Sequence, residues 1–247
     1  MTATLNRRPG TPGTPAPNRT PSAANATARA IVLPLCVILL LVLGGLAIAS
    51  SPAVTAGDLA VIRAIEAARI PFLDAVALAD SVVFSPAGAL IIVAAVSAFA
   101  WFGQRRPGAA VAFAALALIP WLGSTVVKDV VRRPRPLSAD LPHHVLTDTG
   151  FSFPSGHTSF AVALGLALLI VFGRGRLRRP LLAFAIAAPL LTAFSRVYLG
   201  VHNPSDVLAS LVYATAAVLL VLALLRRFAP APVASAVAVR ASRTGGS

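Results

Sequence analysis

Three short polar segments interrupt the long apolar stretches of this chain, at residues 128–136, 154–157 and 195–206. Each lies at the end of an apolar run, so folding can bring the three segments together. The side chains in them that could do chemistry are Lys128, Arg135, Ser155, Gly156, His157, Arg196, His202 and Asp206. Cations, imidazoles, a carboxylate and a Ser-Gly turn are the groups with which a protein can bind and transfer a phosphoryl group.

The cations are candidates for phosphate binding. Transfer of a phosphoryl group depends mainly on positioning and electrostatics, because the group carries about two negative charges. The planar fork of arginine binds two phosphate oxygens at once, and lysine adds a point charge. Lys128 is the only lysine among the 21 basic residues, and it falls inside the first segment. We therefore expect Lys128, Arg135 and Arg196 to bind phosphate.

The second segment, Pro154-Ser155-Gly156-His157, precedes an apolar run that we expect to be helical. Glycine lets the backbone approach an anion closely, and the free amides at a helix start point toward it. Ser155 and Gly156 are therefore further candidates for phosphate binding. His157 follows directly and is placed to protonate a leaving oxygen.

The third segment pairs an imidazole with a carboxylate. Asn203 and Pro204 suit the cap and first position of a helix, which puts Asp206 in the first turn, facing back toward His202. A carboxylate in that position can hold one imidazole nitrogen and leave the other free as a nucleophile. The two histidines can then divide the work, one attacking and one acting as the acid.

The elements that must position these residues are membrane-spanning helices. The chain is 57% hydrophobic and 12% charged, more apolar than a soluble domain of 247 residues can bury. Residues 30–50 carry no charge and are long enough to cross a bilayer; a signal peptide is the alternative, but its apolar core would be shorter. We predict an all-α bundle of six spans, at about 30–50, 82–103, 108–127, 157–173, 180–199 and 207–225.

Three other regions complete the organisation. Charged and apolar residues alternate with helical spacing over residues 53–81, which Pro71 interrupts. This pattern favours one or two amphipathic helices at the membrane interface over a loop packed on the bundle. The composition predicts a disordered basic tail over 1–29, a membrane domain over 30–226 and a disordered tail over 227–247.

Loop charge predicts the orientation of the bundle. The two tails and the loops near residues 105 and 176 carry twice as many basic residues as the remaining loops. By the positive-inside rule, both termini then lie in the cytoplasm. The three polar segments share the opposite face, so we expect a single site that faces outward from the cytoplasmic membrane.

Other classes of site fit the sequence less well. The basic residues lie in short loops and form no basic helix, which argues against nucleic acid as a partner. Cys36 is the only cysteine, so no intrachain disulfide can form. His143 and His144 could in principle bind a metal, but no Cys or Glu lies near them. We expect no metal and no cofactor. The pair could contact a substrate headgroup, but the pattern favours ordinary loop residues, and the same holds for Arg132, Arg133 and Asp148.

The three segments together resemble the signature of the type-2 phosphatidic acid phosphatase family. Its three parts are Lys128, six residues and Arg135-Pro136; Pro154-Ser155-Gly156-His157; and Ser195-Arg196, five residues, His202, three residues and Asp206. The resemblance covers residues 128–206 directly, and the six-span layout extends it to about 30–226. It implies a metal-independent phosphatase in which His202 is the nucleophile, Asp206 orients it and His157 is the general acid. It also implies that Lys128, Arg135, Ser155, Gly156 and Arg196 bind the phosphate.

The sequence thus predicts an enzyme in the lipid bilayer that hydrolyses a lipid phosphate or a polyprenyl pyrophosphate through a phosphohistidine. Phosphatidic acid, phosphatidylglycerol phosphate and undecaprenyl pyrophosphate all remain open as substrates. A lipid phosphotransferase could use the same residues. An anion transporter or channel could use the cations as a binding site, but it would have no need of the His-Asp pair.

Overall fold

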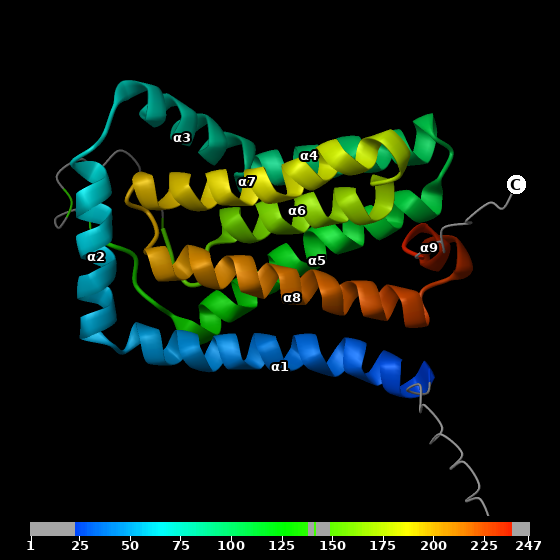
Figure 1. Cartoon of the computed structure of the whole chain (residues 1–247), viewed down its shortest axis with the longest axis horizontal. Coiled ribbons are helices and arrows are strands. Elements are labelled where there is room, and N and C mark those ends of the chain that lie inside the picture. Colours follow the sequence, from blue (N-terminus) through cyan, green and yellow to red (C-terminus); the bar gives the residue numbers. More distant parts are fainter. Residues whose placement is uncertain (1–22, 138–140, 142–148, 239–247) are drawn as a thin grey trace, which may run out of the picture.

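The computed structural model describes residues 23–137, 141 and 149–238, and all regular structure in them is helical. Figure 1 shows long helices running side by side, with α2 crossing one end of the bundle and α9 folded against the other. The helices are α1 (Ala23–Ala49), α2 (Pro52–Glu66), α3 (Pro71–Val83), α4 (Pro86–Ala98), α5 (Pro107–Val131), α6 (Gly156–Phe172), α7 (Arg178–Tyr198), α8 (Pro204–Phe228) and α9 (Ala231–Ala236). A π-helical turn, Phe99–Gly103, extends α4, and a 3₁₀ turn, Gly175–Leu177, precedes α7.

Proline opens five of these helices, α2, α3, α4, α5 and α8. At the first helical position its missing N–H costs nothing, and its fixed φ suits the helix. Serine caps two of the same helices: Ser51 accepts from Val54 N, and Ser85 accepts from Gly88 N. The helix starts are therefore set by local sequence.

Five helices in the described part of the chain are long and apolar enough to cross a membrane: Asn25–Ala49, Pro86–Gly103, Pro107–Val131, Gly175–Tyr198 and Pro204–Phe228. The sixth predicted span, 157–173, is the 17-residue helix α6, which is shorter than these five. Helix α6 packs against α5, α7 and α8. The chain is a multi-pass membrane protein, and its described residues include five helices of spanning length and one shorter apolar helix.

The segment predicted to be amphipathic forms the two helices α2 and α3, and the break falls just before Pro71 as expected. Its buried positions include charged residues, Asp58, Glu66 and Asp80, as well as Ile62 and Ala77. The segment therefore does more than cover the bundle with an apolar stripe, because it brings acidic side chains into the interior.

The end of the described chain differs from the tail expected after residue 226. Helix α8 continues to Phe228, and α9 packs against the start of α5 with Val233 and Ala236 buried. A Cβ on Gly108 would lie 2.1 Å from the Pro232 carbonyl oxygen, so only glycine lets the two backbones approach this closely. The prediction missed α9 because its apolar residues are too few to signal a helix without that contact surface.

Close contact between α6 and α7 holds the centre of the bundle. A Cβ added at Gly165 of α6 would lie 2.7 Å from the Cα of Ala185 in α7, where only a backbone shift could relieve the clash. Around this contact, Phe113, Leu116 and Phe160 are fully buried in one apolar core. Small residues at such crossings let apolar helices pack closely in a bilayer.

Replacing Gly165 by alanine should therefore destabilise the bundle. We expect Gly165→Ala to lower the free energy of unfolding by about 1–3 kcal/mol, the usual cost of overpacking. The thermal unfolding midpoint of the protein in detergent measures this. Gly44→Ala is the matched control, because nothing lies within 4 Å of a Cβ at that position. Equal midpoints for the two variants would contradict the role of the α6–α7 contact.

Candidate active site

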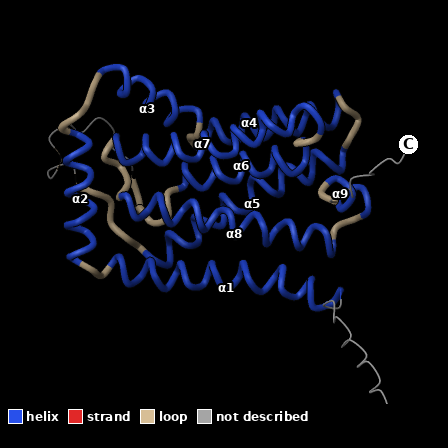
Figure 2. The backbone as a smooth tube through the Cα atoms, in the orientation of Figure 1, coloured by secondary structure: helices blue, strands red, loops and turns tan. Residues whose placement is uncertain are grey.

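The three polar segments meet at the end of the bundle that α2 crosses. Helices α5 and α7 end there and α6 and α8 begin there, and Figure 2 shows the connecting loops gathered beside α2. A cavity of about 190 Å³ lies between them. It is lined by Pro86, Trp121, Ser124, Thr125, Lys128, Arg135, Gly156, His157 and His202. Five of the eight predicted site residues thus surround one cavity.

Lys128 lies in the last turn of α5, and its Nζ donates to the carbonyl oxygens of Phe151, at 2.8 Å, and Ser152, at 3.4 Å. These bonds tie the loop before α6 to the end of α5. A Cβ on Gly156 would lie 3.9 Å from the Cε of Lys128, so the first residue of α6 faces the lysine. The cation and the helix start therefore border the same space.

Arg135 reaches the third segment from the extended stretch that follows α5. Its Nη1 donates to the Val201 carbonyl at 2.7 Å and lies 3.0 Å from Nε2 of His202. Arginine has only donors, so Nε2 must accept this bond with its lone pair. The single proton of the neutral imidazole is then on Nδ1. Arg135 thus selects the tautomer in which Nε2 of His202 carries a lone pair toward the cavity.

The His202 side chain is 1% exposed and stands among positive charges. Burial is the main cause that lowers its pKa well below the ordinary value, and the charges of Arg135, Lys128, Arg196 and His157 lower it further. His202 is therefore neutral at pH 7, the form that has a nucleophilic nitrogen.

Asp206 is fully buried one helical turn after His202. Its Oδ2 lies 3.6 Å from Nδ1 of His202, which is longer than a hydrogen bond. The same oxygen accepts from the backbone N of Asn203 at 2.9 Å and from its Nδ2 at 3.2 Å, in the capping box of α8. Asp206 therefore faces Nδ1 of His202, the nitrogen expected to carry the proton, but its hydrogen bonds come from Asn203 and Arg133.

Ser155 and Arg196 lie behind the cavity. Ser155 is the N-cap of α6, and its buried hydroxyl accepts from Thr158 N at 3.4 Å. Arg196 is 1% exposed and its Nη1 donates to the Ser81 hydroxyl at 2.6 Å. Neither lines the cavity, which differs from the direct phosphate contacts expected of both.

His157 lies in the first turn of α6 and lines the cavity. Its Nε2 lies 3.2 Å from the Ser81 carbonyl oxygen. A carbonyl can only accept, so Nε2 of His157 carries a proton. The Nε2 atoms of the two histidines therefore differ: that of His202 has a lone pair, and that of His157 has a proton.

The structure also adds residues that the sequence did not single out. Arg133 is 2% exposed and donates to Asp206 Oδ1 at 2.6 Å, to the Ser205 hydroxyl at 2.6 Å and to Asp58 Oδ2 at 2.7 Å. The prediction of an ordinary loop residue at Arg133 is wrong, because the chain turns this side chain inward between two acids. The available signal was Asp58, a carboxylate in a segment of apolar periodicity.

Helix α3 contributes a second set of contacts. Ser81 bonds both Arg196 and His157, and Asp80 accepts from the Thr192 hydroxyl at 2.9 Å. Burial raises the pKa of Asp80, and the nearby charge of Arg196 opposes that rise. The segment expected to lie at the interface therefore supports the site from behind. His143 and His144 lie outside the described residues.

Comparison with known proteins agrees with this geometry. A family model described as the PAP2 superfamily matches residues 106–230, half of the chain. Helices α5 to α8 lie within that range, and with them all eight predicted site residues. The match confirms the resemblance drawn from the three motifs.

Three relatives are similar over parts of the chain. Undecaprenyl-diphosphatase BcrC of Bacillus subtilis is 43% identical over 82 residues, 33% of this chain and 39% of that protein. Phosphatidylglycerophosphatase B of Haemophilus influenzae is 42% identical over 74 residues, 28% and 31% of the two chains. Decaprenylphosphoryl-5-phosphoribose phosphatase of Mycolicibacterium smegmatis is 36% identical over 117 residues, 47% and 59%. The aligned regions thus span between 31% and 59% of these relatives' own lengths.

A solved structure shows the same fold. The crystal structure of a transmembrane PAP2 type phosphatidylglycerolphosphate phosphatase from Bacillus subtilis aligns with a TM-score of 0.63 and 24% identity. The alignment covers 77% of this chain and 93% of that one.

Removing the buried guanidinium of Arg133 should destabilise the protein. Arg133→Met would leave Asp58 and Asp206 buried without their partner, and breaking such a pair costs about 3–5 kcal/mol. Arg132→Met is the matched control in the same loop, because Arg132 is exposed. We expect the control to lose less than about 0.5 kcal/mol. Thermal unfolding in detergent compares the two, and equal losses would show that the ion pairs do not hold the fold.

Proposed function

Because this chain belongs to the PAP2 superfamily, we propose that it hydrolyses a lipid phosphate or a polyprenyl pyrophosphate, with His202 as nucleophile. The observation that carries the proposal is the bond between Arg135 and Nε2 of His202, at 3.0 Å. It gives a neutral imidazole a lone pair at the edge of a cavity lined with cations. A site that only bound anions would have no need of a neutral, nucleophilic group there.

In the proposed reaction, Nε2 of His202 attacks the phosphorus and the bond from phosphorus to the lipid oxygen breaks. His157, acting as the imidazolium, gives its Nε2 proton to the departing oxygen, turns from the Ser81 carbonyl to do so and is left neutral. Water then attacks the phosphorus of the phosphohistidine, the neutral His157 takes a proton from that water, and the bond from phosphorus to Nε2 of His202 breaks as phosphate leaves. Each step exchanges one proton between His157 and an oxygen, so the enzyme returns to its starting state.

Lys128 and Arg135 are the proposed direct contacts to the phosphate oxygens, because both line the cavity. When phosphate binds, Arg135 can exchange its bond to His202 for bonds to oxygen and thereby release the lone pair for attack. Amides at the start of α6, next to Ser155 and Gly156, add neutral donors. Arg196 acts from behind, through charge and through its contact with Ser81, and Asp206 favours the proton on Nδ1 of His202.

The proposed orientation places this site on the outer face of the cytoplasmic membrane. The other end of the bundle carries the arginine-rich loops, including Arg105, Arg106, Arg178 and Arg179. Basic loops are retained in the cytoplasm. The names of the relatives suggest the substrate class: two act on polyprenyl compounds and one on a glycerophospholipid. A lipid that carries a phosphate is common to these names, and the cavity of about 190 Å³ has room for a phosphate group.

The mechanism makes a direct test of His202 possible. We expect purified protein in detergent to release phosphate from undecaprenyl pyrophosphate or phosphatidylglycerol phosphate with EDTA present, because side-chain cations supply the positive charge. His202→Ala should reduce kcat by at least about 10⁴-fold, since no nucleophile remains. An unchanged unfolding midpoint shows that the variant is folded. Activity retained in His202→Ala, or a strict need for a divalent metal, would disprove the mechanism.

The pH dependence of kcat/KM tests whether the charge of Arg135 lowers the pKa of His202. Arg135 helps to keep the pKa of His202 low, so the neutral form should persist below pH 6.5. Arg135→Gln removes that charge and should move the acid limb of kcat/KM to higher pH, toward the ordinary histidine value. Arg135→Lys keeps the charge and should leave the limb in place. Measured profiles in which both variants coincide would rule out charge as the cause.

A further inference from the structure

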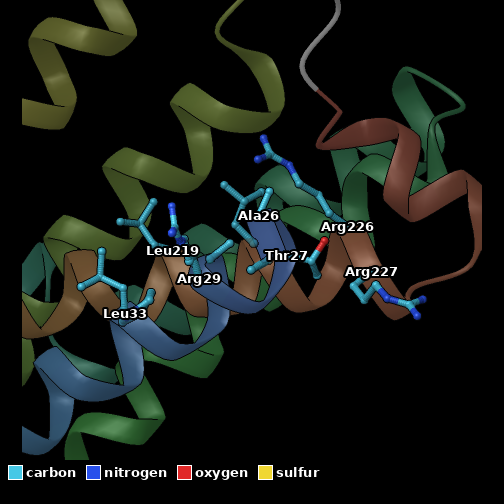
Figure 3. Close-up of a pocket in the computed structure, with 11 residues that line it drawn as sticks. Ala26, Thr27, Arg29, Leu33, Leu219, Arg226 and Arg227 are labelled. Atoms are coloured by element: carbon cyan, nitrogen blue, oxygen red, sulfur yellow. The ribbon is translucent and has the colours of Figure 1, made fainter. Parts of the chain in front are cut away.

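A second cavity lies at the opposite end of the bundle from the candidate active site. It has a volume of about 440 Å³ and lies between the first turns of α1 and the last turns of α8. Figure 3 shows Arg29 entering it from α1 and Arg226 from α8, while Arg227 points away from the other two. Its walls are apolar and include Leu33 and Leu219. The cavity thus combines a cationic mouth with an apolar interior.

Among the residues that the structure describes, no acidic side chain lines the mouth beside these arginines. All eight acidic residues lie in three stretches, 58–80, 129–148 and 206. The described residues of each stretch belong to the end of the bundle that holds the candidate active site. Residues 1–57 and 207–247, which contain α1 and most of α8, have no Asp or Glu. The described side chains thus leave the positive charge at this mouth without a carboxylate partner, and a bound anion can supply one.

The arginine on α8 is held in place. Nε of Arg226 donates to the Val237 carbonyl at 3.1 Å, and Arg174 Nη2 donates to the Ala236 carbonyl at 3.2 Å. The carbonyl of Val237, the residue that follows α9, thus anchors Arg226, and Arg174 holds the end of α9. The bond uses Nε, so the terminal nitrogens of Arg226 remain the groups that a ligand would meet. A positioned fork of this kind suits phosphate oxygens.

The apolar walls indicate that the ligand carries a hydrocarbon chain as well as a phosphate. Leu33 is 67% exposed and Leu219 is 47% exposed, on helices whose length and hydropathy suit the bilayer interior. An acyl chain lying on these leucines would cover apolar surface that continues along α1 and α8. A free inorganic anion would leave that surface unused. Basic clefts between helix ends at the cytoplasmic interface suit anionic lipid headgroups.

We propose that this cleft is a binding site for an anionic phospholipid. Its phosphate lies between Arg29 and Arg226, and an acyl chain follows the groove between α1 and α8. The bound lipid joins the first and last long helices at the end where no ion pair between side chains links them in the described residues. The site is separate from the proposed catalytic cavity, and its occupant is a structural ligand that is not hydrolysed.

Lipid titration of the detergent-solubilised full chain tests the proposal. Dioleoyl phosphatidylglycerol should raise the thermal unfolding midpoint in a saturable way, whereas dioleoyl phosphatidylcholine and inorganic phosphate should not. Arg29→Gln combined with Arg226→Gln should weaken the apparent affinity for phosphatidylglycerol at least tenfold. Arg178→Gln combined with Arg179→Gln is the matched control, because it removes the same charge from exposed positions at the same end.

Three outcomes would overturn the proposal. If phosphatidylcholine raised the unfolding midpoint as much as phosphatidylglycerol does, the charge of the headgroup would not be recognised. If inorganic phosphate did so, the acyl chain would not contribute to binding. An equal loss of affinity in the control pair would indicate general attraction to the basic end. Phosphate release by the cleft variants should stay within about twofold of wild type, which separates this test from that of the catalytic mechanism.

Discussion

The buried guanidinium of Arg133 fixes the geometry on which the site depends. It lies between Asp58 of α2 and Asp206 of α8 and also bonds Ser205, so it joins three parts of the chain that are far apart in sequence. A charge this deeply buried is tolerated only where its partners are well placed. The positions of α2, the stretch after α5 and the start of α8 are therefore linked. His202 immediately precedes that start, and its position is set by the same bonds.

A second constraint is that one set of charges serves two purposes. Burial lowers the pKa of His202, and the charges of Arg135, Lys128 and Arg196 lower it further. In the proposed mechanism the same charges attract the phosphate. The two histidines differ in whether Nε2 carries a proton, and one neighbour decides this in each case. Arg135 donates to Nε2 of His202, whereas the Ser81 carbonyl accepts from Nε2 of His157. A nucleophile and an acid can thus be made from the same side chain within one cavity.

Charge also distinguishes the two ends of the bundle. The end with the candidate active site holds all the acidic residues that the structure describes, and two of them, Asp58 and Asp206, are buried against Arg133. In the described chain, the opposite end has arginines and no acids. The protein interior has a low dielectric constant, so buried cations are paired with acids of the same chain. Exposed cations at the membrane surface can instead be neutralised by anionic lipid. This difference explains why one end forms a buried network and the other forms an open cleft.

The sequence determined the helical class and most of the helix starts, and it predicted eight site residues, five of which line one cavity. Proline and serine at the helix starts are local signals, and the three motifs carry their chemistry in the side chains themselves. It also placed the break in residues 53–81 at Pro71. These features depend on neighbours along the chain, so they can be read without knowing the fold.

Only the tertiary structure decided which of these residues face the cavity and which support it. Arg133 and Arg135 are two residues apart, yet one is buried between acids and the other meets His202. The tautomer of His202, the roles of Asp58 and Ser81 and the docking of α9 also depend on contacts between distant segments. Such contacts are set by packing and by the need to pair buried charges, and neither is encoded in the spacing of residues along the chain.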